Sequence, residues 1–299
     1  MAKLTIGIPL YNRAAYVGEC ARSLFEQSYG DIEYLFIDDG STDGSVDALQ
    51  AVLEAYPQRA AATRVITHER NQGLAATRNH LIDEARGEYV TFCDADDWLD
   101  LDCIATMVAA AERDDADVVA AGMYENHRPM RCDFSRGPNA MTICAANLSV
   151  CNKLIRRTLL NDYALRVPQG INCWEDVSLT ARALAVAART SFIDRPFYHY
   201  RKENQASYTA SSSNQKERMR QQVECARFID AWLAERGLAE RFEPFLLHLK
   251  FASKIKMLSI APRTLRLWQS TFPEANRRIM ANDTIALPYR LLFQLAAWL

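Results

Sequence analysis

The chain has 299 residues, 49% of them hydrophobic, and a formal net charge of −2, so it can bury the core of one large domain or of one domain with an appendage. The charge is uneven, because 21 Lys and Arg stand against 29 Asp and Glu before Asn214, and 14 against 8 from Asn214 onward. This pattern disfavours nucleic acid as a ligand of the acidic front and leaves an anionic membrane surface open as a partner of the basic back.

The N-terminus, the apolar runs and the cysteines bear on location. Met1-Ala2-Lys3 runs directly into strand-like sequence, without a signal peptide, and no apolar run reaches the roughly 18 residues of a membrane-spanning helix. The eight cysteines form no C-x-x-C pair, and several lie in apolar runs where a reduced thiol serves as a small core residue. We therefore expect a cytoplasmic protein.

The first half of the chain alternates between strand and helix patterns. Strands are expected at 4–10, 32–37, 64–67, 87–93 and 117–123, with helices over about 14–28, up to about 55, from the Asn71 turn to about 86, and over about 101–113. Alternation at this spacing predicts βαβ units. The expected fold class is therefore α/β, with a Rossmann-like, mostly parallel sheet flanked by helices.

The second half is less regular. Residues 124–146 predict a loop or a small meander, and order resumes at 151–157. A helix is expected to begin at residues 172–176 and to run to about 188, followed by short strands at 191–193 and 197–200. Beyond a polar hinge at 207–213, helices are expected over 216–236 and 242–260, with a final amphipathic piece. We place the boundary near Ser211, between an α/β domain at 1–210 and a helical region at 211–299.

An acidic cluster follows the fourth strand. Asp94, Asp96 and Asp97 would emerge at its C-terminal end, which is where ligands bind in open α/β sheets. Three carboxylates so close together repel one another unless cations or hydrogen-bond donors neutralise them. A divalent metal carrying a phosphorylated substrate would do so, and the alternative is a solvated turn with a helix N-cap.

Polar residues also follow the other strands. The strand ends read Pro9-Leu10-Tyr11-Asn12, then Asp38-Asp39-Gly40-Ser41, then Asn71-Gln72-Gly73 with Arg78-Asn79, and then Asp94-Ala95-Asp96-Asp97. One nucleotide-binding cleft explains four successive polar strand ends better than four unrelated turns do. The order and the residues of these motifs resemble those of family 2 glycosyltransferases of the GT-A fold, over roughly residues 3–210.

The resemblance implies a donor site and a metal site. The residues that would hold the nucleotide-sugar are Pro9, Tyr11, Asn12, Asp39, Asn71, Gly73, Arg78, Asp94, Ala95, Asp96, Arg201 and Ser207, and Asp96 and His199 would hold Mn²⁺ or Mg²⁺. Asp39 can accept a hydrogen bond from the imide N–H of uracil, and Tyr11 can stack on a base. The alternatives are a helix cap for Asp39, ordinary packing for Tyr11 and His199, and a solvated helix face for Arg78.

Two further motifs extend the resemblance. In Trp174-Glu175-Asp176, Asp176 stands where the family keeps its catalytic base and Glu175 is its neighbour, with helix capping as the alternative. Asn152, Lys153 and Trp174 would contact the acceptor, although capping also suits the Asn152 stretch. Tyr198-His199-Tyr200-Arg201, with Ser207 beyond, resembles the segment that closes over the diphosphate.

These motifs predict an inverting, metal-dependent glycosyltransferase of the bacterial surface-polysaccharide type. It would move a sugar from a UDP-sugar to a hydroxyl of a lipid-linked or growing oligosaccharide. The rivals are a catalytically inactive sugar-nucleotide-binding module and a sugar nucleotidyltransferase, although residues 9–12 lack the Gly-rich phosphate loop that the latter needs. Residues 287–299 are too short to span a bilayer, and we expect them to lie on the inner face of the plasma membrane or, equally, to dock on the protein or in a homo-oligomer.

Overall fold

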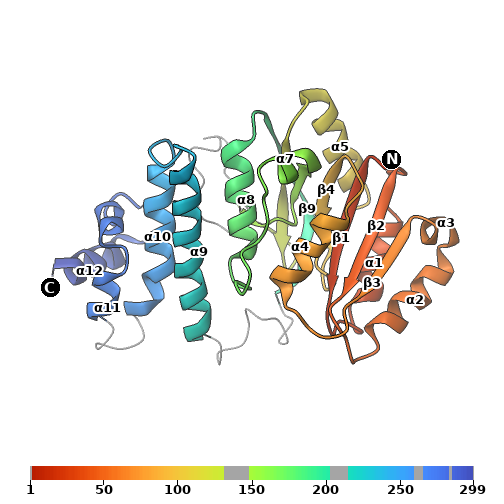
Figure 1. Ribbon diagram of the computed structural model, residues 1–299, viewed down its shortest axis with the longest axis horizontal. Helices are drawn as coiled ribbons and strands as arrows, with labels where there is room; N and C mark the ends of the chain where they lie inside the picture. Colours follow the sequence, from red (N-terminus) through yellow and green to blue (C-terminus); the bar gives the residue numbers. More distant parts are fainter. Residues whose placement is uncertain (1, 131–147, 203–214, 259–264, 283–284, 299) are drawn as a thin grey trace.

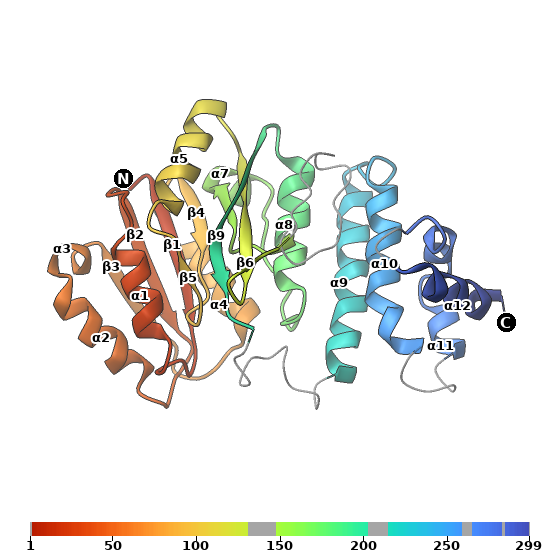
Figure 2. The same ribbon diagram turned by 180° about the vertical axis from the view of Figure 1, so that it is seen from behind.

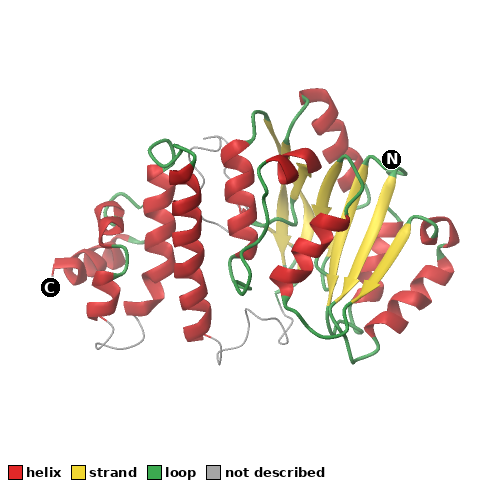
Figure 3. Cartoon of the chain, viewed as in Figure 1, coloured by secondary structure: helices red, strands yellow, loops and turns green. Residues whose placement is uncertain are grey.

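The structure is a computed structural model that describes residues 2–130, 148–202, 215–258, 265–282 and 285–298. An α/β half carries a sheet with helices on both faces, and a group of helices follows beside it (Figure 1). Figure 3 shows the same division, because every strand precedes residue 201 and the described chain beyond it is helix and loop. The expected α/β fold with a C-terminal helical extension is confirmed.

The sheet is parallel at one end and mixed at the other. Its order is β3-β2-β1-β4-β8-β6-β9-β5, with β7 on β6. The parallel pairs are β1 with β2, β1 with β4, β2 with β3, and β6 with β9, whereas β8, β5 and β7 pair antiparallel. The strands are β1 (Leu4–Leu10), β2 (Ile32–Asp38), β3 (Thr63–Thr67), β4 (Tyr89–Phe92), β5 (Trp98–Leu99), β6 (Val118–Glu125), β7 (Arg128–Pro129), β8 (Lys153–Arg156) and β9 (Thr190–Tyr200). The first four strands in this order are therefore parallel, as expected from the sequence, and the rest of the sheet is antiparallel except for the pair of β6 with β9.

The strand order changes direction between β1 and β4, since β2 and β3 lie on one side of β1 and β4 lies on the other. Such a switch point opens a crevice at the carboxyl ends of the strands, where α/β proteins bind ligands. Every residue of β1 and β2 is buried, as expected for central strands covered by helices on both faces. The sheet thus forms a rigid floor beneath the predicted site.

Helices cover both faces of this sheet. Helices α1 and α2 lie on one face, and α4 and α8 lie on the other (Figures 1 and 2). The helices of the α/β half are α1 (Val17–Phe25), α2 (Ser45–Ala55), α3 (Pro57–Ala60), α4 (Leu74–Glu84), α5 (Cys103–Asp114), α7 (Arg157–Asp162) and α8 (Glu175–Val186). Beyond them lie α9 (Gln215–Glu235), α10 (Glu243–Leu258), α11 (Leu265–Ser270), the 3-10 helix η4 (Pro273–Arg278) and α12 (Leu287–Trp298).

The C-terminal helices pack on the α/β half through α8, which lies between the sheet and α9 (Figures 1 and 2). The guanidinium of Arg182 on α8 lies over the rings of Phe228 and Trp232 on α9, with centroid distances of 4.8 and 5.6 Å. Further out, the buried ammonium of Lys254 donates to the carbonyls of Trp268, Thr271 and Phe272. None of the described helices is long and apolar enough to cross a membrane.

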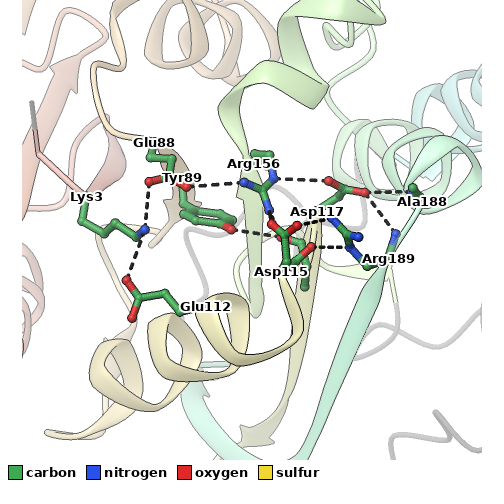
Figure 4. A network of polar contacts seen from close by, with 10 residues as sticks. Lys3, Glu88, Tyr89, Glu112, Asp115, Asp117, Arg156, Ala188 and Arg189 are labelled. Carbon is green, nitrogen blue, oxygen red and sulfur yellow. Dashed lines mark hydrogen bonds and ion pairs between the residues drawn. The ribbon is translucent and has the colours of Figure 1, made fainter.

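Charged residues form a separate network at the edge where β4, β6 and β9 begin and the antiparallel β8 ends (Figure 4). Arg156 pairs with Asp115 at 2.6 Å and with Asp117 at 3.2 Å, and its guanidinium lies over the Tyr89 ring. Asp117 also accepts the backbone N–H groups of Ala188 and Arg189. This network joins β4, β6, β8 and β9 at the edge opposite the predicted site, so we assign it to stability.

Some local expectations need correction. The two strands expected at 191–193 and 197–200 are one strand, β9, with an irregular register opposite Gly122, because Arg195 and Pro196 bend it without ending its pairing. The two-residue β5 and the strand β8 were not predicted, since runs this short carry little hydrophobic period. Residues 131–147, Ser207 and the boundary near Ser211 lie outside the described residues.

Candidate active site

The loops after β1 and β2 are tied together by their polar residues. The backbone N–H of Asn12 donates to Ser41 Oγ at 3.0 Å, and the Asn12 side chain accepts from the N–H of Thr42 at 2.9 Å. Tyr11 lies between these loops and β1 and is 42% exposed, so ordinary core packing does not explain it. Its ring is available to a ligand.

Asp39, at the end of β2, is almost fully buried and heavily hydrogen-bonded. Its Oδ1 accepts from the N–H of Gln72 at 2.9 Å and lies 2.7 Å from His68 Nδ1, and its Oδ2 accepts from the N–H of Gly73 at 2.9 Å. The alternative that Asp39 caps the following helix is wrong, because its partners lie in the loop after β3. Asp39 thus fixes the 71–73 turn against β2.

The same turn contacts the segment before α8. Gly73 has φ of 91°, and a Cβ at this position would lie 3.0 Å from Asn172 Oδ1. That oxygen accepts from the N–H of Ala75 at 3.0 Å and so satisfies the first turn of α4. Residues nearly 100 positions apart are therefore held together at the carboxyl edge of the sheet.

Arg78 is the centre of a buried ion-pair network. Its guanidinium is 2% exposed and donates to Glu175 Oε1 at 2.8 Å and to Asp94 Oδ1 at 2.9 Å. Burial alone would lower the pKa of Arg78, but the two carboxylates more than offset it, so the pKa is raised. The alternative of a solvated charge is wrong. Arg78 joins the end of β4 to the start of α8.

The start of α8 carries the two predicted catalytic carboxylates. Trp174 before it has φ of 68°, a left-handed conformation that is costly for a bulky residue and is found mainly at functional sites. Glu175 is buried against Arg78, whereas Asp176 is partly exposed and its Oδ1 accepts only from the N–H of Val177 at 2.7 Å. Neither side chain therefore caps the helix in the ordinary way from the position before it.

Both carboxyls have raised pKa values. Burial raises the pKa of Glu175 to about 8, with Arg78 opposing the shift and Asp176 adding to it. Burial also raises the pKa of Asp176, with Arg78 and then Lys153 among the groups that lower it. A carboxylate whose pKa is moved toward neutrality is better suited to accept a proton in catalysis.

The three aspartates of the cluster after β4, Asp94, Asp96 and Asp97, have different partners. Asp97 is buried, accepts from the Tyr198 hydroxyl at 2.5 Å and from the N–H of Arg201 at 2.8 Å, and so ties the cluster to β9. Burial, followed by the charges of Asp94 and Asp96, raises the pKa of Asp97. Asp97 therefore serves the fold of the loop, while Asp94 and Asp96 are paired with the arginines Arg78 and Arg13.

Asp96 and Arg201 have partners that the sequence did not predict. Asp96 Oδ2 lies 3.3 Å from Arg13 Nε. Arg201 donates from Nε to the Asp96 carbonyl at 3.0 Å and from Nη2 to Glu19 at 2.6 Å. One signal in the sequence points to Arg13, namely its position next to the predicted site residue Asn12.

His199 is packed between aromatic rings, as the alternative interpretation held. It stacks on Trp98 and Tyr124 with centroid distances of 4.8 and 4.5 Å, and its Nε2 lies 2.8 Å from Asp100. Its Nδ1 is buried and has no hydrogen-bond partner within the described part of the chain. That orphaned nitrogen leaves a metal-ligand role open.

The predicted metal site depends on the ligand atoms that the described residues offer. In the described part of the chain, no group of three or more His, Cys, Asp or Glu could hold an ion unaided. Mg²⁺ and related ions at diphosphates usually take one or two carboxylates and complete their shell with phosphate oxygens and water. Asp96 and His199 Nδ1 stay the predicted protein ligands of such a shared site.

The remaining predicted residues are placed as follows. Pro9, Ala95, Asn152 and Lys153 are buried, and Asn71 is exposed. Asn152 donates to the carbonyl of Ala121 at 2.6 Å and precedes a strand, so helix capping is not its role. Contact of Asn152, Lys153 and Trp174 with the acceptor stays a prediction.

Comparisons with known proteins agree with this geometry. Residues 5–163 match the sequence profile described as glycosyl transferase family 2. "Putative glycosyltransferase EpsH" of Bacillus subtilis is 33% identical over 209 residues, which cover 65% of this chain and 59% of that protein. "Glycosyltransferase GlyG" of Streptococcus pneumoniae is 27% identical, with coverage of 67% and 71%. The chain thus spans little more than half the length of EpsH.

Solved structures share the fold. The crystal structure of S. aureus TarS in complex with UDP-GlcNAc has a TM-score of 0.76 and 21% identity, and the match covers 99% of this chain and 89% of that one. The mannosyltransferase PcManGT from Pyrobaculum calidifontis, in complex with GDP-Man and Mn²⁺, has a TM-score of 0.59 and 18% identity, with coverage of 99% and 84%.

A mixed sheet with a switch point between β1 and β4, carboxylates at the strand ends and helices on both faces defines a GT-A protein. The profile match covers more than half of the sequence, from β1 to the end of α7. The chain belongs to glycosyltransferase family 2.

Proposed function

We propose that this protein is an inverting glycosyltransferase that moves a sugar from a UDP-sugar to a hydroxyl of a lipid-linked or growing surface oligosaccharide. The arrangement at the start of α8 supports this most directly. Glu175 is buried and bonded to Arg78, whereas Asp176 next to it is partly exposed and accepts a local hydrogen bond from the N–H of Val177. Asp176 is thus the carboxylate of the pair that can meet an acceptor.

An acceptor hydroxyl must lose its proton as it attacks the anomeric carbon. Asp176 would take that proton, and the raised pKa of its carboxyl makes it a stronger base than an ordinary aspartate. Arg78 holds the first turn of α8 against Asp94 at the end of β4. The same guanidinium therefore orients the base relative to the donor side of the site.

The donor side rests on different residues. Asp39 and the exposed ring of Tyr11 would receive the base, and the TarS structures contain UDP or UDP-GlcNAc. Asp96 and His199 Nδ1 would hold a divalent ion, which when bound supplies positive charge to the leaving diphosphate. Arg13 and Arg201, both beside Asp96, can add hydrogen bonds to phosphate oxygens.

Asp176→Asn tests the base. General-base assistance contributes about 10² to 10⁴ in rate, so the variant should lose roughly that factor in transfer and keep its affinity for UDP-sugar. Asp162→Asn, at the exposed end of α7, is the matched control and should transfer at the wild-type rate. Near-normal transfer by Asp176→Asn, or a product with the anomeric configuration of the donor, would contradict the proposal.

The metal is tested separately by calorimetry. Carboxylates facing a diphosphate without a cation repel it, so EDTA should abolish binding of the UDP-sugar, and Mn²⁺ should restore it. Equal affinity with and without EDTA would remove the metal from the proposal. Slow hydrolysis of UDP-sugar by the purified protein would argue against the rival of an inactive binding module, and family membership disfavours a nucleotidyltransferase.

The C-terminal helix supports an acceptor at the inner face of the plasma membrane. Its large exposed side chains are Leu287, Tyr289, Leu291, Leu292, Leu295 and Trp298. Residues 265–299 carry four arginines and two acidic residues, Asp283 and Glu274, the second of which is paired with Lys250. An apolar face with arginines nearby suits the interface of an anionic bilayer better than the same basic region of a second copy.

Liposome flotation tests this contact. The full chain should float with vesicles that contain an anionic lipid and not with neutral vesicles, and Leu291→Asp with Leu295→Asp should abolish flotation. Leu267→Asp, an exposed leucine on α11, is the control. Unchanged flotation of the double variant would refute the contact, and a dimer that the same double variant dissolves would assign the face to a homo-oligomer.

A further inference from the structure

Two histidines that the mechanism does not use form a chain behind Asp39. His68 Nδ1 lies 2.7 Å from Asp39 Oδ1, and His68 Nε2 lies 2.8 Å from His80 Nδ1. The two rings are parallel to within 4°. His68 follows β3 and His80 lies on α4, so the chain runs from the floor of the site to a covering helix.

The hydrogen-bond count at Asp39 is informative. An ionised carboxylate has about four acceptor positions, and Oδ1 is used twice, by Gln72 N–H and by His68. Oδ2 is used once, by Gly73 N–H. Among the described residues, one acceptor position of Asp39 therefore has no donor, and it is on Oδ2.

We propose that His68, held by His80, positions Asp39 so that its remaining acceptor selects uracil, which makes the two histidines positioning residues for donor specificity. This inference rests on the proposed function, because it takes Asp39 as the group that meets the base. Uracil presents an imide N–H at N3, whereas cytosine presents a lone pair there that faces a carboxylate unfavourably. A single, fixed acceptor discriminates between them.

The direction of the chain follows from the chemistry of its members. An ionised carboxylate only accepts, so Nδ1 of His68 carries a proton and donates to Asp39. In the neutral ring, Nε2 then accepts from His80 Nδ1–H. Among the donors at Asp39, His68 is a side chain and the other two are backbone groups, so substitution can remove it without changing residues 71–73 of the turn.

Calorimetry with UDP and CDP, at one Mn²⁺ concentration, tests the proposal. Loss of a hydrogen bond to a charged group corresponds to roughly a 10-fold change in affinity. His68→Ala should bind UDP roughly 10-fold more weakly and CDP unchanged, so that the preference for UDP falls. His80→Ala should show a smaller loss. His68→Asn, whose amide can donate in place of Nδ1, should regain part of the preference.

His248→Ala is the control, because His248 is also partly buried and bonded to one side chain, Asn282. A purely structural role would weaken UDP and CDP together, and this result, or wild-type preference in His68→Ala, would overturn the proposal. If His68→Ala does not fold, the ratio of UDP affinity to CDP affinity is measured in His80→Ala and His68→Asn instead. A wild-type protein that binds CDP as well as UDP would instead refute the proposed reading of uracil by Asp39.

Discussion

Glu175→Gln should stabilise the protein at neutral and alkaline pH, although it removes one member of a buried ion pair. Glu175 is buried and bonded to Arg78 at 2.8 Å, and burial raises the pKa of its carboxyl from 4.5 to about 8 against the opposing effect of Arg78. Asp94 and Asp176 share the same guanidinium electrostatically. Three carboxylates thus compete for Arg78, and we expect Glu175 to hold a proton near neutral pH.

The sign and size follow from linkage. Between pH 4.5 and 8, Glu175 is protonated in the folded protein and ionised in the unfolded chain, so stability is fully present below pH 4.5 and is lost as the pH rises toward 8. At about 1.4 kcal/mol per pH unit, the loss reaches about 3 kcal/mol at pH 7 and about 4 kcal/mol at pH 8, where half of the folded molecules have already ionised at this carboxyl. Gln resembles the protonated acid and cannot ionise, so the variant avoids this loss.

Urea unfolding at several pH values measures the effect as a difference between variant and wild type, in which other titrating groups cancel. The two free energies of unfolding should agree near pH 5, and the variant should gain with rising pH. Glu217→Gln, at an exposed glutamate paired with Arg220, should show no such gain. A variant less stable than wild type by about 3–5 kcal/mol at pH 8, as for a broken buried ion pair, would refute the reasoning.

Three further predictions concern charge, backbone and packing. Lys153 lowers the pKa of Asp176, so Lys153→Met should raise that pKa and move the acidic limb of the kcat/KM pH profile to higher pH. An unchanged acidic limb would show that Lys153 does not influence the ionisation of the catalytic base. Gly73→Ala should destabilise the protein by about 1–3 kcal/mol and weaken UDP binding, whereas Gly44→Ala, also at positive φ but with no atom near its Cβ, should cost about 1 kcal/mol and leave UDP binding unchanged in calorimetry. Lys254→Met should cost about 2–5 kcal/mol in urea unfolding, because three buried carbonyls lose their donor, and a neutral result would assign those carbonyls to water.

The sequence by itself determined the elements with a strong local pattern. The fully buried strands β1 and β2 are mostly apolar runs, and the polar residues that follow them lie in the predicted loops. The order of those ends was enough to indicate the family, because each motif is short and contiguous. The long C-terminal helices were also predicted, since their period extends over many turns.

Only the tertiary structure decided which residues are partners. Arg78 and Glu175 are 97 positions apart, as are Ala75 and Asn172, and Asp39 meets His68 and the 71–73 turn rather than its own helix. No local pattern encodes such contacts, because they depend on how strands order in the sheet and on where α8 docks. The sequence placed carboxylates at the site, and packing decided which of them is buried against a cation and which is left to meet a substrate.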